Sequence, residues 1–226
     1  MGFIKKLNKD FLIKDNRIIL SKEYLSKNKW KFKKITGSRF ASVIGKNKYN
    51  TSLKTGCIMV GIYQDDFDPF FAEIGNIIEP KITQYAREKL GTDFMVYDPK
   101  KISWDVFPNN KIFGGIPDGE PIDLNGVFNY DNYPMLEIKT TGIDSFEYNY
   151  INNKFILQKT HDNLPILKKE FGNYNKWFKN DELIIPDEYI YQLSLYLYLR
   201  KVTKGIFFIG FSDEIISTDD LRKNLA

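Results

Sequence analysis

The stretch Pro134-Met135-Leu136-Glu137-Ile138-Lys139-Thr140 decides the fold of this sequence. Its alternation predicts a β-strand with Glu137 and Lys139 on one face and Leu136 and Ile138 on the other. On a solvated face the two charged side chains would form an ordinary salt bridge. On a covered face they need a partner or a metal ion, because burying an unpaired charge is costly.

The segments around this strand predict helices that cover both of its faces. Apolar residues recur at helical spacing over 70–90, and Pro80 either kinks this helix or begins it. A second, strongly apolar helix is expected over 187–200, with Gln192 as a polar residue in mid-span. A buried strand is expected over 206–211. This order predicts an α/β (α+β) fold with a mixed central β-sheet flanked by helices.

Weaker patterns cover the rest of the chain. The first thirty residues predict a peripheral strand or helix, and residues 39–44 predict a short helix with a hydroxyl N-cap and a glycine stop. Residues 112–117 predict a short strand that ends in a turn. Residues 141–185 are polar and aromatic with weak periodicity, which predicts an insertion or lid within a single domain spanning 1–226.

Composition excludes several kinds of site. The 226 residues contain one cysteine and one histidine, which excludes a disulfide framework and a cysteine-rich zinc site and argues against a Ser-His-Asp triad. Thirty-three basic and 29 acidic residues give a net charge of +4, which permits a polyanionic partner without requiring one. No run approaches the roughly 20 apolar residues that cross a bilayer, so we expect a cytoplasmic protein without a membrane partner.

Carboxylates and lysines are then the groups that could carry chemistry. Asp118 lies in a turn at a strand end, and Glu79 lies on a helix beside Pro80. Carboxylates that converge without histidine form a hard-oxygen site suited to Mg²⁺ or Mn²⁺. Such an ion lowers the pKa of a bound water and stabilises charge on a phosphoryl oxygen, and an adjacent lysine can hold that water or help to deprotonate it. This combination predicts phosphodiester hydrolysis.

Each candidate residue also has a purely structural interpretation. Asp118 suits an ordinary turn, Glu79 suits the first turn of a helix, and Gln192 suits a satisfied polar position in the core. Ser38 can be only an N-cap. Each structural interpretation is reasonable by itself, but all of them would have to hold at once.

Four blocks of the sequence, taken in order, resemble the PD-(D/E)XK nucleases, and within them the exonucleases similar to phage lambda exonuclease and the YqaJ-type viral recombinases. The blocks are Ile35-Thr36-Gly37-Ser38-Arg39-Phe40-Ala41-Ser42-Val43-Ile44-Gly45, Gly75-Asn76-Ile77-Ile78-Glu79-Pro80, Pro117-Asp118 with Glu137-Ile138-Lys139, and Tyr191-Gln192-Leu193-Ser194-Leu195-Tyr196. The resemblance implies a restriction-endonuclease-like core.

The resemblance also implies catalytic roles for the residues that match the motifs. Asp118 and Glu137 would be metal ligands, and the carbonyl of Ile138 would complete the set. Glu79 would bind the metal directly or through water. Lys139 would position or activate the attacking water.

The remaining matched residues would contact the substrate. Gln192 would orient Lys139 or the substrate phosphate. Ser38, at a helix N-terminus where free N–H groups favour anions, would bind a DNA phosphate, which in the exonucleases is the 5′-phosphate of the digested strand. Positive charge would come from Arg39 and from Lys33 or Lys34, where the family has an arginine with its bidentate fork.

The function implied by the resemblance is a metal-dependent DNA nuclease that uses Mg²⁺, with Mn²⁺ able to replace it. The leading form is a double-strand exonuclease of phage-type recombination or repair. The alternatives are an endonuclease of the same fold and a non-catalytic DNA-binding module. The expected partners are DNA and a single-strand annealing protein, and relatives include ring-shaped trimers that thread DNA.

Overall fold

A computed structural model of the chain describes residues 3–4, 9–15, 17–29, 32–64, 69–142, 147–152, 154–161, 163, 166, 174–180 and 182–212. The helices in these ranges are α1 (Lys22–Asn28), α2 (Gly37–Val43), α3 (Ser52–Met59), α4 (Pro69–Leu90), α5 (Tyr174–Trp177) and α6 (Asp187–Arg200). The strands are β1 (Phe3–Ile4), β2 (Phe11–Lys14), β3 (Arg17–Leu20), β4 (Tyr63–Gln64), β5 (Asp93–Met95), β6 (Glu120–Ile122), β7 (Met135–Gly142), β8 (Tyr148–Ile151), β9 (Lys154–Leu157), β10 (Phe178–Lys179), β11 (Glu182–Leu183) and β12 (Gly205–Ser212).

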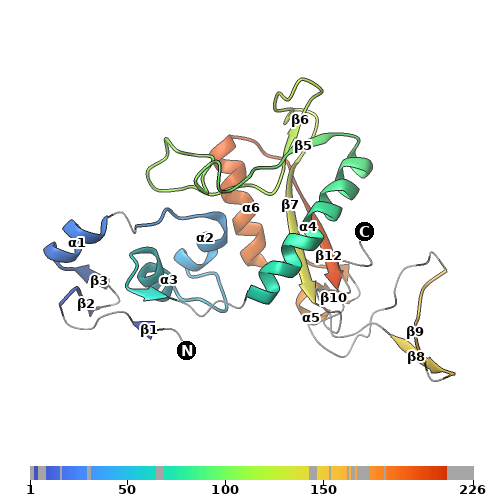
Figure 1. The fold of residues 1–226 in the computed structure, drawn as a ribbon, viewed down its shortest axis with the longest axis horizontal. Helices are drawn as coiled ribbons and strands as arrows, with labels where there is room; N and C mark the ends of the chain where they lie inside the picture. Colours follow the sequence, from blue (N-terminus) through green and yellow to red (C-terminus); the bar gives the residue numbers. More distant parts are fainter. Residues whose placement is uncertain are drawn as a thin grey trace.

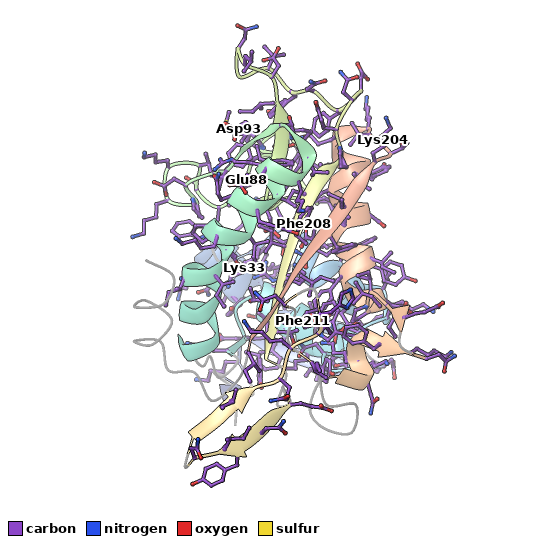
Figure 2. The ribbon with its side chains drawn as sticks, turned by 90° about the vertical axis from the view of Figure 1, so that its right-hand side faces the viewer. Lys33, Glu88, Asp93, Lys204, Phe208 and Phe211 are labelled. Atoms are coloured by element: carbon purple, nitrogen blue, oxygen red, sulfur yellow. The ribbon has the colours of Figure 1, made fainter. Side chains whose placement is uncertain are left out.

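The parallel pair β7–β12 forms the centre of the molecule; it lies between α4 and α6 in Figure 2, and α4 crosses it in Figure 1. Its register places Met135 opposite Gly205 and ends with Gly142 opposite Ser212. Because side chains alternate along a strand, even-numbered residues of β7 face α4 and odd-numbered ones face α6. The predicted strand and its cover on both faces are confirmed.

The face of β7 toward α4 is apolar. Leu136 and Ile138 pack there against Ala86 of α4, and Phe208 of β12, labelled in Figure 2, joins the same cluster. The helix can approach closely because β12 has Gly210 at the contact, where a Cβ would lie 2.7 Å from the side chain of Ile82. Burying each large apolar side chain stabilises the fold by about 1.5–3 kcal/mol, so this contact holds α4 firmly on the sheet.

The opposite face of β7 packs against α6. Met135 is fully buried there with Leu193 and Tyr196 of α6 and with Phe107. The helix has the predicted bounds and stops at Arg200, because Lys201 takes a left-handed conformation that ends the helical hydrogen bonding. α6 therefore lies over the strand face that carries Glu137 and Lys139.

The antiparallel pair β5–β6 lies beside the other edge of β7. Gly119, just before β6, bridges to Leu136 of β7 through two backbone hydrogen bonds of 2.9 and 3.2 Å. The order β5-β6-β7-β12 therefore combines antiparallel and parallel pairing. This arrangement agrees with the predicted α/β class, and the bridge carries Asp118 to the edge of β7.

The strand predicted over 112–117 does not form. Phe113 makes a single parallel bridge to Ile35, and Gly115 then has a φ of +123°, which takes the backbone out of the strand conformation. Gly115 is required because a Cβ there would lie 2.7 Å from the hydroxyl of Tyr196.

Two helix starts were left open or misplaced by the sequence. α4 spans the predicted 70–90 run from Pro69 and continues through Pro80, so the alternative in which the helix begins at Pro80 is wrong, and Gly91 ends it as predicted. The N-cap of α2 is Thr36 and not Ser38, which lies inside the first turn, and the Thr36 side chain makes no capping hydrogen bond.

The chain outside the central layers forms smaller units. The first thirty residues contain both a β2–β3 hairpin and α1, where the alternatives were one or the other, and Tyr24 of α1 is buried against Cys57 and Ile62. Within 141–185, the β8–β9 hairpin extends away from the body (Figure 1), whereas α5 brings the fully buried Trp177 onto the core. Among the described residues, no helix has the length and apolar character that spanning a bilayer requires.

Candidate active site

Two carboxylates meet where the start of β6 reaches β7. The backbone N–H of Ile138 donates a hydrogen bond of 2.7 Å to Oδ2 of Asp118, which fixes that carboxylate at the strand edge. Glu137, the preceding residue, has no exposed surface. Burial raises the pKa of Glu137 to about 8, and the nearby charge of Asp118 acts in the same direction. Burial also raises the pKa of Asp118.

Lys139 neutralises this pair. Its ammonium donates to Oε1 of Glu137 and, at 3.0 Å, to the carbonyl of Ile138, and it lies 4.0 Å from Oδ2 of Asp118. Burial alone would lower the pKa of Lys139, but the charges of the two carboxylates outweigh it and raise that pKa. The amine is therefore protonated at neutral pH. The predicted same-face pair is buried and joined to a second carboxylate, so it is not an exposed salt bridge.

Gln192 joins this group from α6, the helix that packs on the β7 face with Glu137 and Lys139. Its side-chain amide donates a hydrogen bond to the same Oε1 of Glu137 that accepts from Lys139. On the other side of Gln192, α2 packs closely on α6, since at Gly37 a Cβ would lie 2.7 Å from Cγ of Gln192. The structure thus brings together Asp118, Glu137, Lys139 and Gln192.

Glu79 faces this group across a cavity. The cavity has a volume of about 390 Å³, and Glu79, Asp118 and Ile138 are among the residues that line it. Burial raises the pKa of Glu79, the charge of Asp118 raises it further, and Lys139 opposes both. Across the described ranges, no three histidine, cysteine, aspartate or glutamate side chains converge closely enough to form a metal cage by themselves. Glu79 therefore lies near the carboxylate pair but does not join it.

The donor atoms around the carboxylate pair fit a hard divalent cation. Oε2 of Glu137 is buried and has no hydrogen-bond partner among the described residues, and an unsatisfied buried acceptor of this kind is costly. The carboxylates of Asp118 and Glu137 and the carbonyl of Ile138 offer oxygen ligands only, which suits Mg²⁺ or Mn²⁺. A bound cation would satisfy the orphaned oxygen and stabilise both negative charges.

A second cavity lies beside the first and is lined by basic and hydroxyl groups. It has a volume of about 660 Å³, and Lys33, Ser38 and Arg39 contribute to its wall. Burial lowers the pKa of Arg39, whose guanidinium donates to Oγ1 of Thr36 at 3.3 Å. Within the described part of the chain no carboxylate forms an ion pair with Arg39, so its charge is available to an anion.

Lys34 lines the same cavity but is already engaged. Its ammonium donates to Oδ2 of Asp105 at 2.6 Å and to the carbonyl of Phe107 at 2.8 Å. Lys34 therefore contributes mainly to holding the 105–107 loop, and the charge available to a ligand comes from Lys33 and Arg39.

Comparison of the sequence with known protein families places the chain in one of them. The model of the YqaJ-like viral recombinase domain matches residues 28–203. The chain belongs to this family. The match spans all four motif blocks, and the family resemblance expected from them is confirmed. Family membership implies a nuclease of the phage-recombinase type that would act on DNA.

Two similar curated proteins carry no assigned function. "Uncharacterized protein MG373" of Mycoplasma genitalium is 51% identical over 213 residues, which cover 93% of this chain and 76% of that protein. The "Uncharacterized protein MG373 homolog" of Mycoplasma pneumoniae is 50% identical over the same shares. No solved structure matches the chain significantly.

Sequence reasoning missed part of what positions the site in this YqaJ-like domain. Tyr196 lies in the core, and its hydroxyl also interacts with the backbone N–H groups of Gly37 and Ile116. It thereby joins α6 to the start of α2 and to the segment before Asp118. Its spacing of four residues from Gln192 places both on one helix face, which is the only signal that could have indicated this role.

A buried ion pair beyond Asp118 was also missed. Glu120 is fully buried and accepts two hydrogen bonds from Arg200, at 2.5 and 2.7 Å, and the hydroxyls of Tyr97 and Tyr130 donate to the same carboxylate. Glu120 is two residues after Asp118, so strand alternation places both on one face, and this is the signal that could have indicated a role for Glu120 near the site. This network fastens β6 to the end of α6.

An aromatic group covers Lys139. The ammonium of Lys139 lies 5.2 Å from the ring centroid of Tyr189, and Trp177 stacks on the same ring with the centroids 5.4 Å apart. Lys176 also contacts Tyr189, donating to its hydroxyl at 3.2 Å. Part of the 141–185 segment therefore packs against the aromatic group that covers Lys139.

Proposed function

We propose that this chain is a metal-dependent DNA nuclease that hydrolyses phosphodiester bonds, with Mg²⁺ as its cofactor and Mn²⁺ able to replace it. The observation that carries the proposal is the buried group of Asp118, Glu137 and Lys139, in which a fully buried carboxylate oxygen lacks a partner. A merely structural ion pair would satisfy both of its oxygens. The α4–sheet–α6 arrangement supports a restriction-endonuclease-like core.

Each residue has a role derived from its contacts. Asp118, Glu137 and the carbonyl of Ile138 would hold the cation, and Glu79 would reach it through water from across the cavity. When bound, the cation would lower the pKa of a water molecule and offset charge on the phosphoryl oxygens. Lys139, protonated at neutral pH, would orient the attacking water as a hydrogen-bond donor.

Gln192 has a positioning role in this proposal. Its amide holds one oxygen of Glu137, so the other oxygen stays directed toward the cation. Tyr189 covers the ammonium of Lys139 and limits its movement. These contacts keep both groups in place before the substrate arrives, which is how an enzyme lowers the cost of reaching the transition state.

The second cavity supports action at DNA ends. Ile116 lines both cavities, so the basic one adjoins the carboxylate one. Arg39, Lys33 and Ser38 would bind a terminal phosphate there while a neighbouring phosphodiester lies at the carboxylates. An exonuclease is therefore the leading form, in recombination or repair.

One experiment tests this function and separates its forms. An end-labelled linear duplex and a covalently closed circle are incubated with the protein in Mg²⁺ and in chelator. We expect the linear duplex to be degraded only with the metal and the circle to remain intact. Cleavage of the circle would indicate the endonuclease, and binding without cleavage in Mg²⁺ or Mn²⁺ would refute the nuclease.

A further inference from the structure

The basic cavity carries an exposed aromatic side chain at its rim. Trp104 lies in the loop between β5 and β6, lines the cavity with Ser38 and Arg39, and keeps 62% of its surface exposed. Tryptophan normally buries its large apolar surface. In contrast, Trp177 has no exposed surface. The position of Trp104 therefore needs an explanation that the fold does not supply.

The loop holds Trp104 in this position by an unusual backbone. Ser103 and Trp104 have φ values of +53° and +58°, in the left-handed region that non-glycine residues rarely occupy. Such strain persists only where the surroundings impose it, and it concentrates at binding sites.

Hydrogen bonds on both sides of Trp104 impose this conformation. Its backbone N–H donates to the carbonyl of Pro99 at 2.8 Å. The neighbouring Asp105 accepts from the backbone N–H groups of Phe107 and Gly115 at 2.9 and 3.1 Å and pairs with Lys34. The backbone that carries the exposed indole is therefore fixed, which lowers the entropy that ordering this loop would cost a ligand.

The cavity combines two chemistries that a nucleotide also combines. Arg39 and Lys33 offer positive charge for a phosphate, and Trp104 offers a flat apolar surface. Every nucleic-acid base has a face that stacks on an aromatic ring, whatever the sequence. A phosphate alone would leave the indole unused, and an apolar ligand would leave Arg39 unused.

We propose that Trp104 is the stacking surface for the base of the terminal nucleotide whose phosphate enters the basic cavity. The inference rests on the proposed function for the identity of the ligand as DNA. Stacking on a fixed indole holds an end with any base, because the contact does not read hydrogen-bonding groups. Trp104 thus gives the site a preference for an unstacked terminal nucleotide over an internal one.

Binding of a short oligonucleotide tests the proposal without requiring hydrolysis. The probe is a single-stranded tetranucleotide with a 5′-phosphate and the fluorescent base 2-aminopurine at its first position, and a second probe has an abasic first position. Both are titrated in chelator with the parent protein and with W104A, W104F and Y198A. Tyr198 is the matched control, because it is an aromatic residue of α6 with 72% exposure and is not among the residues lining either cavity.

The parent protein and Y198A should bind the first probe equally and quench its fluorescence. W104A should bind it at least about fivefold more weakly without quenching, and W104F should recover part of both. On the abasic probe all four proteins should bind equally. An equal loss of affinity for both probes in W104A, or no loss for either, would overturn the proposal.

The outcome is separable from that of the proposed function. Quenched binding by a parent protein that fails to degrade duplex DNA would refute the nuclease and keep the stacking site. Degradation by a parent protein whose binding is insensitive to W104A would refute the stacking site alone. Failure to bind either probe would refute the stacking site whatever the duplex assay shows.

Discussion

Replacing Glu137 by glutamine should stabilise the metal-free protein as the pH rises, although it removes a residue of the site. Burial raises the pKa of Glu137 from its ordinary value of 4.5 to about 8. Between these values the folded protein retains a proton that the unfolded chain has released. The free energy of unfolding therefore falls as the pH increases through this window. Glutamine has the shape of the protonated acid and does not titrate, so E137Q escapes this loss.

The size of the effect follows from the two pKa values. Linkage between about pH 5.5 and about pH 7.5 gives a loss of about 2 to 3 kcal/mol for the wild type, so the advantage of E137Q over the wild type grows by about the same amount across this interval. At about pH 4.5 and below, both proteins should be nearly equally stable. Urea unfolding in chelator at a series of pH values measures the difference, and E88Q, an exposed carboxylate on α4, controls for the loss of one charge.

Adding Mg²⁺ should reduce the advantage of E137Q. A ligand that binds only the folded state at a hundred times its Kd stabilises by about 2.7 kcal/mol, and the wild type should gain this while E137Q gains much less. The gain should increase with pH, because the cation displaces the proton of Glu137. A stability difference between wild type and E137Q that is constant from pH 5.5 to 7.5 in chelator would refute the raised pKa assigned to the buried Glu137.

Three further substitutions test separate parts of the site. K139A should lower kcat on linear duplex DNA by at least about a hundredfold while K204A leaves it unchanged, and a K139A enzyme with normal kcat would remove the lysine from the chemistry. R200M leaves Glu120 buried and unpaired and should cost about 3 kcal/mol in urea unfolding; a loss below about 1 kcal/mol would show that the pair is not buried. G37A should cost about 1–3 kcal/mol through overpacking and also lower kcat, although alanine favours a helix, and a stabilised G37A would contradict the close α2–α6 contact.

The elements that could be predicted from the sequence are those whose signal is local. The strand at β7 and the helix at α6 follow from short-range periodicity and a flanking proline, and their positions were right. The contact between Asp118 and Glu137 could be expected only because the motif pattern was recognised. The spacing along the chain does not indicate that Gly119 bridges to Leu136.

The features that escaped prediction depend on contacts between residues distant in the chain. The failed strand at 112–117 is an example: its apolar residues suit a strand, but Gly115 has a φ of +123°, and the hydroxyl of Tyr196 leaves no room for a Cβ beside it. The pairing of Glu120 with Arg200 joins residues 80 positions apart. Local propensity does not predict such tertiary contacts, and at these positions the contacts determine the backbone conformation.

The segment from Gly115 to Glu120 explains why these distant contacts matter for the site. Its first residues line the basic cavity, and Asp118 lines the cavity beside the carboxylates. Glu120, at its end, forms the buried ion pair with Arg200. Tyr196 and Arg200 both belong to α6 and lie one turn apart, so a single helix holds the segment at both ends. Because Gln192 is one turn before Tyr196, that helix also sets the position of Glu137.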